Sequence, residues 1–162
     1  MVNRMIPFVV VLAACGGSTA SVEGTAGDVS WGDTDYVYVG SRYIVVSGVE
    51  IDCRDIDWID RTYDDGVNPA GMDVATLQFT FASGDAVEAG KFSIAKGAAV
   101  QSTIVHVSGD TTHIYDATSG ILQVDSTEDG GTTTGSFDSV VFDDGGTLSG
   151  TFTAQWCVNL KS

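Results

Sequence analysis

Short stretches in which apolar and polar residues alternate recur through most of the chain. The clearest is residues 73–82, DVATLQFTFA. A period of two predicts a strand with one buried face, and no long segment repeats its apolar residues at helical spacing. In this stretch the apolar face comprises Ala75, Leu77, Phe79 and Phe81. The strands that the whole pattern predicts are 35–39, 42–52, 73–82, 90–95, 99–107, 112–116, 120–126, 135–142 and 147–158.

The last two of these strands are separated by Asp143-Asp144-Gly145-Gly146. An Asp-Gly centre supplies the positive φ angles of a type I′ turn, so a tight antiparallel hairpin is expected here. A second hairpin turn is predicted at residues 108–111, SGDT. The residues predicted to form the core face of the final strand are Leu148, Phe152, Ala154, Trp156 and Val158.

Composition agrees with a chain made of strands. It contains 20 glycines and 2 prolines and carries a formal net charge of −15. Glycine-rich chains with many Thr, Ser and Val favour strands joined by tight turns. We therefore predict a single all-β domain over residues 31–162, an antiparallel β-sandwich or flattened β-barrel of about eight to ten strands. The negative charge disfavours nucleic acid and anionic lipid headgroups as partners, because like charges repel.

The N-terminus carries a different pattern. Arg4 precedes a run of about nine apolar residues, IPFVVVLAA, which is far short of the roughly 20 needed to span a bilayer and suits a signal peptide. The run ends in Leu12-Ala13-Ala14-Cys15, which resembles the lipobox of bacterial lipoproteins. The resemblance implies that residues 1–14 are removed and that Cys15 becomes the lipidated first residue. The alternative is an ordinary secretory signal with an incidental cysteine.

The residues after Cys15 bear on location. The residue after the cysteine is Gly16 and not aspartate, and in this the chain resembles Gram-negative lipoproteins that are sorted to the outer membrane. The expected location is therefore the cell envelope, on the periplasmic face of the outer membrane or on the cell surface. Residues 16–30, GGSTASVEGTAGDVS, are expected to form a flexible tether of roughly 20 Å. The segments SGILQV, TGSF and LSGTF also resemble small uncharacterised all-β lipoprotein domains, a resemblance that carries no known active residues.

Two cysteines remain once Cys15 is assigned to the lipid. In an oxidising exported compartment we expect them to form a disulfide, Cys53 to Cys157. Closing a loop of roughly 100 residues contributes about 4.7 kcal/mol in the chain-entropy model. A metal thiolate site and intermolecular pairing are the alternatives.

Two groups of residues are weak candidates for metal sites. The turn at residues 108–111 would place His106 opposite His113, on the face shared with Ile104 and Tyr115, and such a pair can ligate zinc but needs a third ligand. The loop DCRDIDWIDRTYDDG, residues 52–66, begins like a calcium loop with Asp55 and Asp57 but departs from the EF-hand pattern at Asp60 and Gly66. We expect instead a solvated loop in which Arg54 and Arg61 form ion pairs with neighbouring aspartates.

No nucleophile motif, phosphate loop or zinc-protease motif is present in the sequence. Three function classes stay open: a non-enzymatic envelope module that binds a protein or glycan or is structural, a β-barrel carrier of a small apolar ligand, and a hydrolase with an unrecognised carboxylate pair. We expect the first, with no cofactor, no catalytic residues and attachment to the membrane through the lipid.

Overall fold

The computed structural model describes residues 18–34, 36–50, 73–82, 86–128, 130–157 and 160. These residues form strands and turns and contain no helix, and therefore no helix that could cross a membrane. The strands are β1 (Thr19–Ala26), β2 (Val29–Ser30), β3 (Tyr36–Val39), β4 (Tyr43–Ser47), β5 (Val74–Phe81), β6 (Gly90–Ile94), β7 (Val100–Ser108), β8 (Thr111–Thr127), β9 (Thr132–Phe142) and β10 (Thr147–Trp156).

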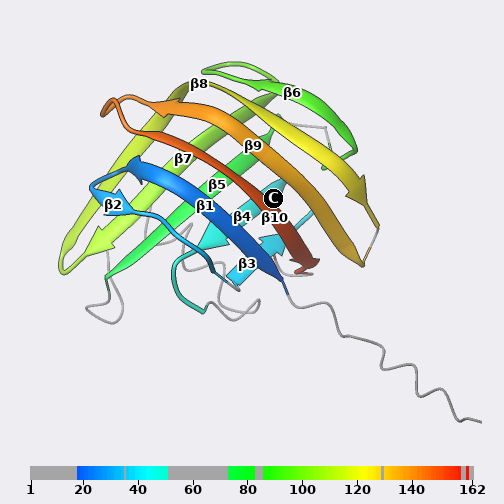
Figure 1. Ribbon diagram of the computed structural model, residues 1–162, viewed down its shortest axis with the longest axis horizontal. Coiled ribbons are helices and arrows are strands. Elements are labelled where there is room, and N and C mark those ends of the chain that lie inside the picture. Colours follow the sequence, from blue (N-terminus) through cyan, green and yellow to red (C-terminus); the bar gives the residue numbers. More distant parts are fainter. Residues whose placement is uncertain are drawn as a thin grey trace, which may run out of the picture.

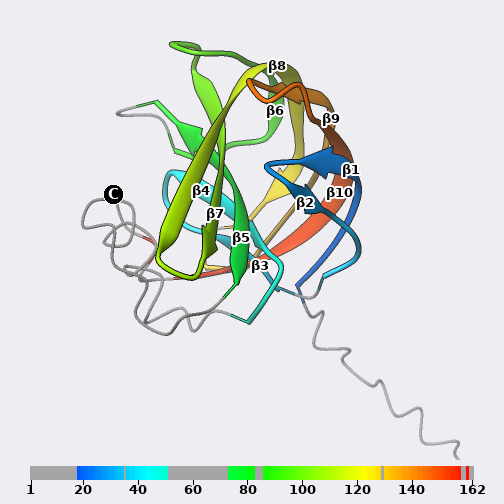
Figure 2. The ribbon, with the colours of Figure 1, turned by 90° about the vertical axis from the view of Figure 1, so that its left-hand side faces the viewer.

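The strand pairings close into a barrel. From β3 they pass through β4, β5, β7, β8 and β9 to β10, which pairs with β3 again. Strand β1 pairs with the same edge of β10 as β3 does. In the same way, β6 and β7 pair with successive parts of one edge of β8, and the two strands meet at Ile94 and Val100. Figure 1 shows β8, β9 and β10 side by side, and Figure 2 shows the strands wrapping around a common interior. The predicted all-β single domain with a flattened barrel is confirmed.

Apolar side chains fill the middle of the barrel. Phe79 of β5 and Phe137 of β9 are 0% and 2% exposed, and their ring centroids lie 5.2 Å apart. Two strands separate β5 from β9 along the pairing order, so this contact spans the interior. Close-packed rings of this kind leave no room for a ligand between them.

Glycines on β9 and β10 make room for the rings on the neighbouring strand. Gly135 pairs with Phe152, and Gly150 pairs with Phe137. A Cβ at either glycine would lie 2.7 Å from a ring carbon of its partner phenylalanine, closer than a real Cβ contact allows. The two Gly-x-Phe segments therefore interlock in antiparallel register, and each glycine is required for packing rather than for a turn.

A second apolar cluster lies on the outside of the barrel. Tyr38 of β3, Val45 of β4, Cys157 and Leu160 are buried together, with Tyr36, Tyr43 and Val49 packed against them. On β5 the outward residues Val74 and Thr76 are each 2% exposed. Strands β3, β4 and β5 are consequently buried on both faces over much of their length.

The expected tether over residues 15–30 is wrong from residue 19 onward, and so is the domain start at residue 31. Strand β1 occupies residues 19–26 and pairs with β10 over seven positions. Its inward residues Ala20, Val22 and Ala26 are 3–4% exposed. Because two of them are alanines, their period of two was a weak hydrophobic signal.

Two predicted strands, 112–116 and 120–126, are one continuous strand, β8. The interruption expected between them is a bulge, with register shifts between Ala117 and Ile121 against β9 and a φ of 154° at Gly120. The bulge bends β8, so that its first part pairs with β7 and its second part with β6. A glycine that suggested a turn here permits a bend instead.

The hairpin between β9 and β10 is confirmed, but its turn type is not. Asp144 lacks the positive φ that a type I′ turn requires, whereas Gly145 has a φ of 86°. The Gly145 N–H donates to the Phe142 carbonyl and the Phe142 N–H to the Gly146 carbonyl, which fits a type I turn followed by a glycine bulge. The sheet is also not wholly antiparallel, because β10 pairs with β3, and β6 with β7, in parallel.

Candidate functional site

The outward side chains of β1, β10 and β9 form rows of hydroxyl groups. Thr19 lies opposite Thr153, which lies opposite Thr134, and in the next row Ser21 lies opposite Thr151, which lies opposite Ser136. Alternation puts them outside because the residues between them face the core. We call these six residues the hydroxyl face: Thr19, Ser21, Thr134, Ser136, Thr151 and Thr153.

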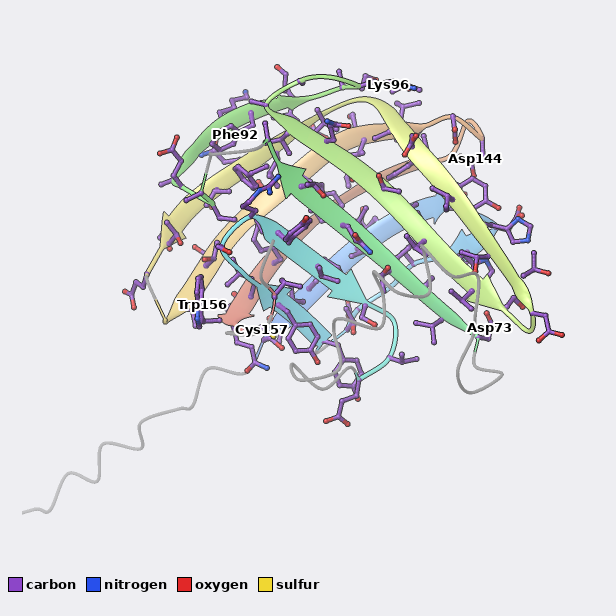
Figure 3. The ribbon with its side chains drawn as sticks, turned by 180° about the vertical axis from the view of Figure 1, so that it is seen from behind. Asp73, Phe92, Lys96, Asp144, Trp156 and Cys157 are labelled. Carbon is purple, nitrogen blue, oxygen red and sulfur yellow. The ribbon has the colours of Figure 1, made fainter. Side chains whose placement is uncertain are left out.

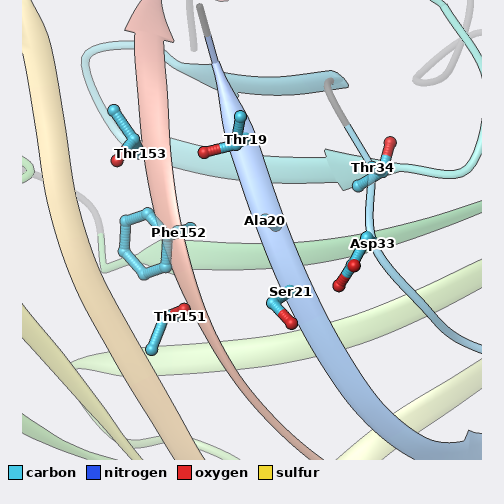
Figure 4. Close-up of a pocket in the computed structure, with 8 residues that line it drawn as sticks. All are labelled: Thr19, Ala20, Ser21, Asp33, Thr34, Thr151, Phe152 and Thr153. Atoms are coloured by element: carbon cyan, nitrogen blue, oxygen red, sulfur yellow. The ribbon is translucent and has the colours of Figure 1, made fainter. Parts of the chain in front are cut away.

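A groove of about 400 Å³ lies on this face (Figure 4). The segment after β2 forms its second wall and is fixed to β1 by two backbone hydrogen bonds between Ala20 and Thr34, of 2.7 and 2.8 Å. This segment brings the carboxylate of Asp33 to the groove. The residues that line it are Thr19, Ala20, Ser21, Asp33, Thr34, Thr151, Phe152 and Thr153.

A second groove, of about 330 Å³, adjoins the first because Ser21 and Thr151 line both. Gly150 and Phe137 are part of its lining, and Glu23 contributes a carboxylate. At its edge Ser149 Oγ accepts a hydrogen bond of 3.0 Å from the Ser139 N–H. The two grooves together run along β1 and β10.

The lining of the two grooves defines the ligand chemistry that they suit. Hydroxyl groups both donate and accept hydrogen bonds, and carboxylates accept them. Neither groove is lined by Lys or Arg, and two carboxylates, Asp33 and Glu23, line them. Anionic ligands are therefore disfavoured, and the lining can exchange hydrogen bonds with a ligand rich in hydroxyl groups.

A separate acidic group lies at the end of the barrel where β1 turns into β2. The Tyr115 hydroxyl donates to Asp28 Oδ2 at 3.1 Å, and the Gly27 N–H donates to Asp144 Oδ2 at 2.7 Å. Partial burial is the largest of the effects that raise the pKa of Tyr115. The hydrogen bond to Asp28 and the negative charges of Asp28, Asp144 and Asp143 raise it further. No group of three metal-ligating side chains is found among the described residues, here or elsewhere.

The predicted pairing of His106 with His113 is confirmed, and Ile104 pairs with Tyr115 on the same face. The two imidazole centroids are 6.4 Å apart. His106 Nε2 lies 2.8 Å from Asp73 Oδ1, an interaction that the sequence did not suggest. The pair thus has a carboxylate partner, while the third ligand that a zinc site requires is not found among described residues.

The structure describes only one of the other predicted site residues, Cys157. Cys157 is 1% exposed and disulfide-bonded, whereas Cys53 lies outside the described residues, so their pairing stays a prediction. The lipidation residue Cys15 and the calcium candidates Asp55, Asp57 and Asp60 also lie outside them.

Sequence reasoning missed the grooves because one side of them is formed by Thr19, Ala20, Ser21 and Glu23, which lie in the segment taken for a tether. The alternation of Ala20, Val22 and Ala26 was the signal that could have located β1. No protein-family model matches the chain, and comparison with curated proteins and with solved structures finds no match either.

Proposed function

We propose that this protein is a bacterial envelope lipoprotein, anchored at the outer membrane through Cys15, that binds a neutral glycan without catalysing a reaction. The observation that carries the binding role is the pair of adjoining grooves on the hydroxyl face, lined by hydroxyl groups and two carboxylates. Sugar hydroxyls would donate to Asp33 and Glu23 and exchange hydrogen bonds with the threonines.

The interior supports a surface site over the alternative of an apolar carrier. The contact between Phe79 and Phe137 occupies the middle of the barrel, where a carrier would hold its ligand. The grooves are instead open to solvent and polar. A polar, partly hydrated surface can bind a glycan through direct and water-mediated hydrogen bonds.

The anchor is tested by expressing the full chain in a Gram-negative host. We expect the mature protein to carry the mass of the acyl groups and to fractionate with outer membranes. The Cys15→Ser variant should be released as a soluble protein that lacks this mass. An unacylated wild-type protein whose cysteine is intact would contradict the anchor.

The binding role is tested on a panel of neutral and acidic polysaccharides with the lipid-free domain from residue 18. We expect the double variant Thr151→Val with Thr153→Val to weaken binding to a neutral glycan at least tenfold, because it removes two hydroxyls and keeps the side-chain shape. Thr111→Val is the matched control, since Thr111 is exposed on the β7–β8 hairpin, away from both grooves. Equal binding by both variants would exclude the hydroxyl face.

A further inference from the structure

The chain between the predicted lipid and the barrel is very short. Ser18 is already fixed, since it is 6% exposed and its Oγ accepts a hydrogen bond of 3.3 Å from the Val37 N–H. Only Gly16 and Gly17 lie between Cys15 and Ser18 along the chain, so the two Cα atoms, three residue steps apart, can be separated by at most about 11 Å. An acylated Cys15 would thus hold one end of the barrel next to the lipid headgroups.

Strand β1 begins at the end of the barrel where β10 finishes, because Thr19 pairs with Thr153 in antiparallel register. The Cys157 N–H donates to the Val39 carbonyl, and the Trp156 N–H donates to the Gly131 carbonyl. Figure 3 places Trp156 and Cys157 at one end of the barrel and Asp73 and Asp144 at the other. We call the first the entry end, formed by residues 40–42, residues 130–131 and Trp156.

Charge is distributed unequally between the two ends. The far end carries five exposed aspartates, and none of the cations among the described residues lies there. Arg42 is at the entry end, and the other described cations, Lys91 and Lys96, lie on β6 and in the turn after it. Because bacterial membrane surfaces that contain anionic lipids repel carboxylates, the far end should point away from the bilayer. Its aspartates are Asp28, Asp73, Asp110, Asp143 and Asp144.

The side chains at the entry end suit a headgroup layer. The Arg42 guanidinium lies 5.9 Å from the centre of the Tyr43 ring and donates to the Phe81 carbonyl, and Tyr43 and Trp156 are each half-buried. Tyr, Trp and Arg combine an apolar body with a polar tip, which is why they are enriched where membranes meet water. Two exposed glutamates, Glu88 and Glu128, also lie near this end.

We propose that the barrel stands end-on against the membrane, with the entry end in the headgroup layer and the acidic end directed away from it. The inference rests on the proposed anchor at Cys15. It places the hydroxyl face on the side of the standing barrel, where the grooves stay open to a ligand.

Hydrogen–deuterium exchange on the acylated full chain tests this orientation. The acylated protein is reconstituted in vesicles of phosphatidylethanolamine with a minority of phosphatidylglycerol and compared with the Cys15→Ser protein in solution. We expect exchange to slow severalfold in peptides covering residues 40–42 and 130–131. Exchange should be unchanged at residues 109–110 and 143–146, in the turns of the acidic end.

The matched control inserts a glycine–serine linker of about 15 residues between Gly16 and Gly17, which gives a reach of roughly 20 Å. This variant should be acylated but lose the protection. Protection at the acidic end, or equal exchange at both ends in an acylated protein, would overturn the orientation alone. Absence of acyl mass would overturn the anchor as well, so the two failures are distinguishable.

Discussion

Two walls of the barrel differ in the solvent exposure of their outward side chains. The buried wall, β3, β4 and β5, has outward residues such as Tyr38, Val45 and Val74 that are 2–4% exposed. The exposed wall, β9 and β10, has outward residues such as Thr151 and Gln155 that are in contact with solvent. Both walls contribute phenylalanines to one interior, so the difference lies entirely on the outside.

The residue type at outward positions therefore indicates whether a strand is covered or faces solvent. Segments YVYV and YIVVS of β3 and β4 are almost continuously apolar, which is typical of strands buried on both faces. Strands β9 and β10 alternate apolar residues with Thr, Ser and Asp, which is typical of one wet face. Of these two walls, the exposed wall is therefore the one that offers a surface for a polar ligand.

Removal of the contact between Phe79 and Phe137, which joins the two walls, should cause the largest loss of stability. Truncation of Phe137 to alanine removes the ring that meets Phe79 and leaves a cavity, so we expect a loss of about 3–5 kcal/mol in the free energy of unfolding. Denaturant titration followed by fluorescence measures it. Phe137→Leu is the control and should cost less, and a loss below about 1 kcal/mol for the alanine variant would mean that the walls are not in firm contact.

The disulfide of Cys157 adds to the outer layer of the buried wall. If its partner is Cys53, the variants Cys53→Ser and Cys157→Ser should each lose about 2–5 kcal/mol, because the unfolded chain gains freedom. Non-reducing peptide mapping of the wild-type protein identifies the pair directly. A Cys53→Ser variant with unchanged stability would exclude this pairing.

Matched substitutions on the two walls test whether their outward positions differ in their contribution to stability. Val45→Thr places a hydroxyl in a buried outer cluster and should cost about 1–3 kcal/mol if that hydroxyl finds no partner. Thr153→Val, on the exposed wall, should change stability by no more than about 0.5 kcal/mol. Thermal unfolding of both variants measures the difference. Equal effects would mean that the outer cover of the buried wall contributes little.

The smallest effect is expected from the bond between Tyr115 and Asp28. Because the pKa of Tyr115 is raised, the folded protein holds this proton more tightly than the unfolded chain does. The associated stability is present below pH 10.0, the ordinary pKa of tyrosine, and is lost as the pH rises through the raised pKa. Tyrosinate absorbance should show a late-titrating group that is absent in Tyr115→Phe and titrates earlier in Asp28→Asn. Titration of Tyr115 at its ordinary pKa would show that the bond is absent in solution.

Strand positions were predictable wherever a strand has large apolar residues on one face, as in β5 and β10. The opposition of His106 and His113 was predictable as well, because a two-residue turn fixes the register of a hairpin. The groove was not, since β1 has small inward residues and Asp33 reaches the groove through a backbone contact between Ala20 and Thr34. Long-range contacts of this kind leave no local pattern.

The strand content, the inward face of most strands and the expectation of a lipid at Cys15 could all be read from local sequence, because each depends on residues close together in the chain. The three-dimensional structure was needed to show that β1 belongs to the barrel, that β8 bends at Gly120 instead of ending, and that β3 pairs in parallel with β10 and β6 with β7. These features follow from closing a sheet on itself. Closure requires each edge to find a partner, and which partner is near depends on the whole barrel.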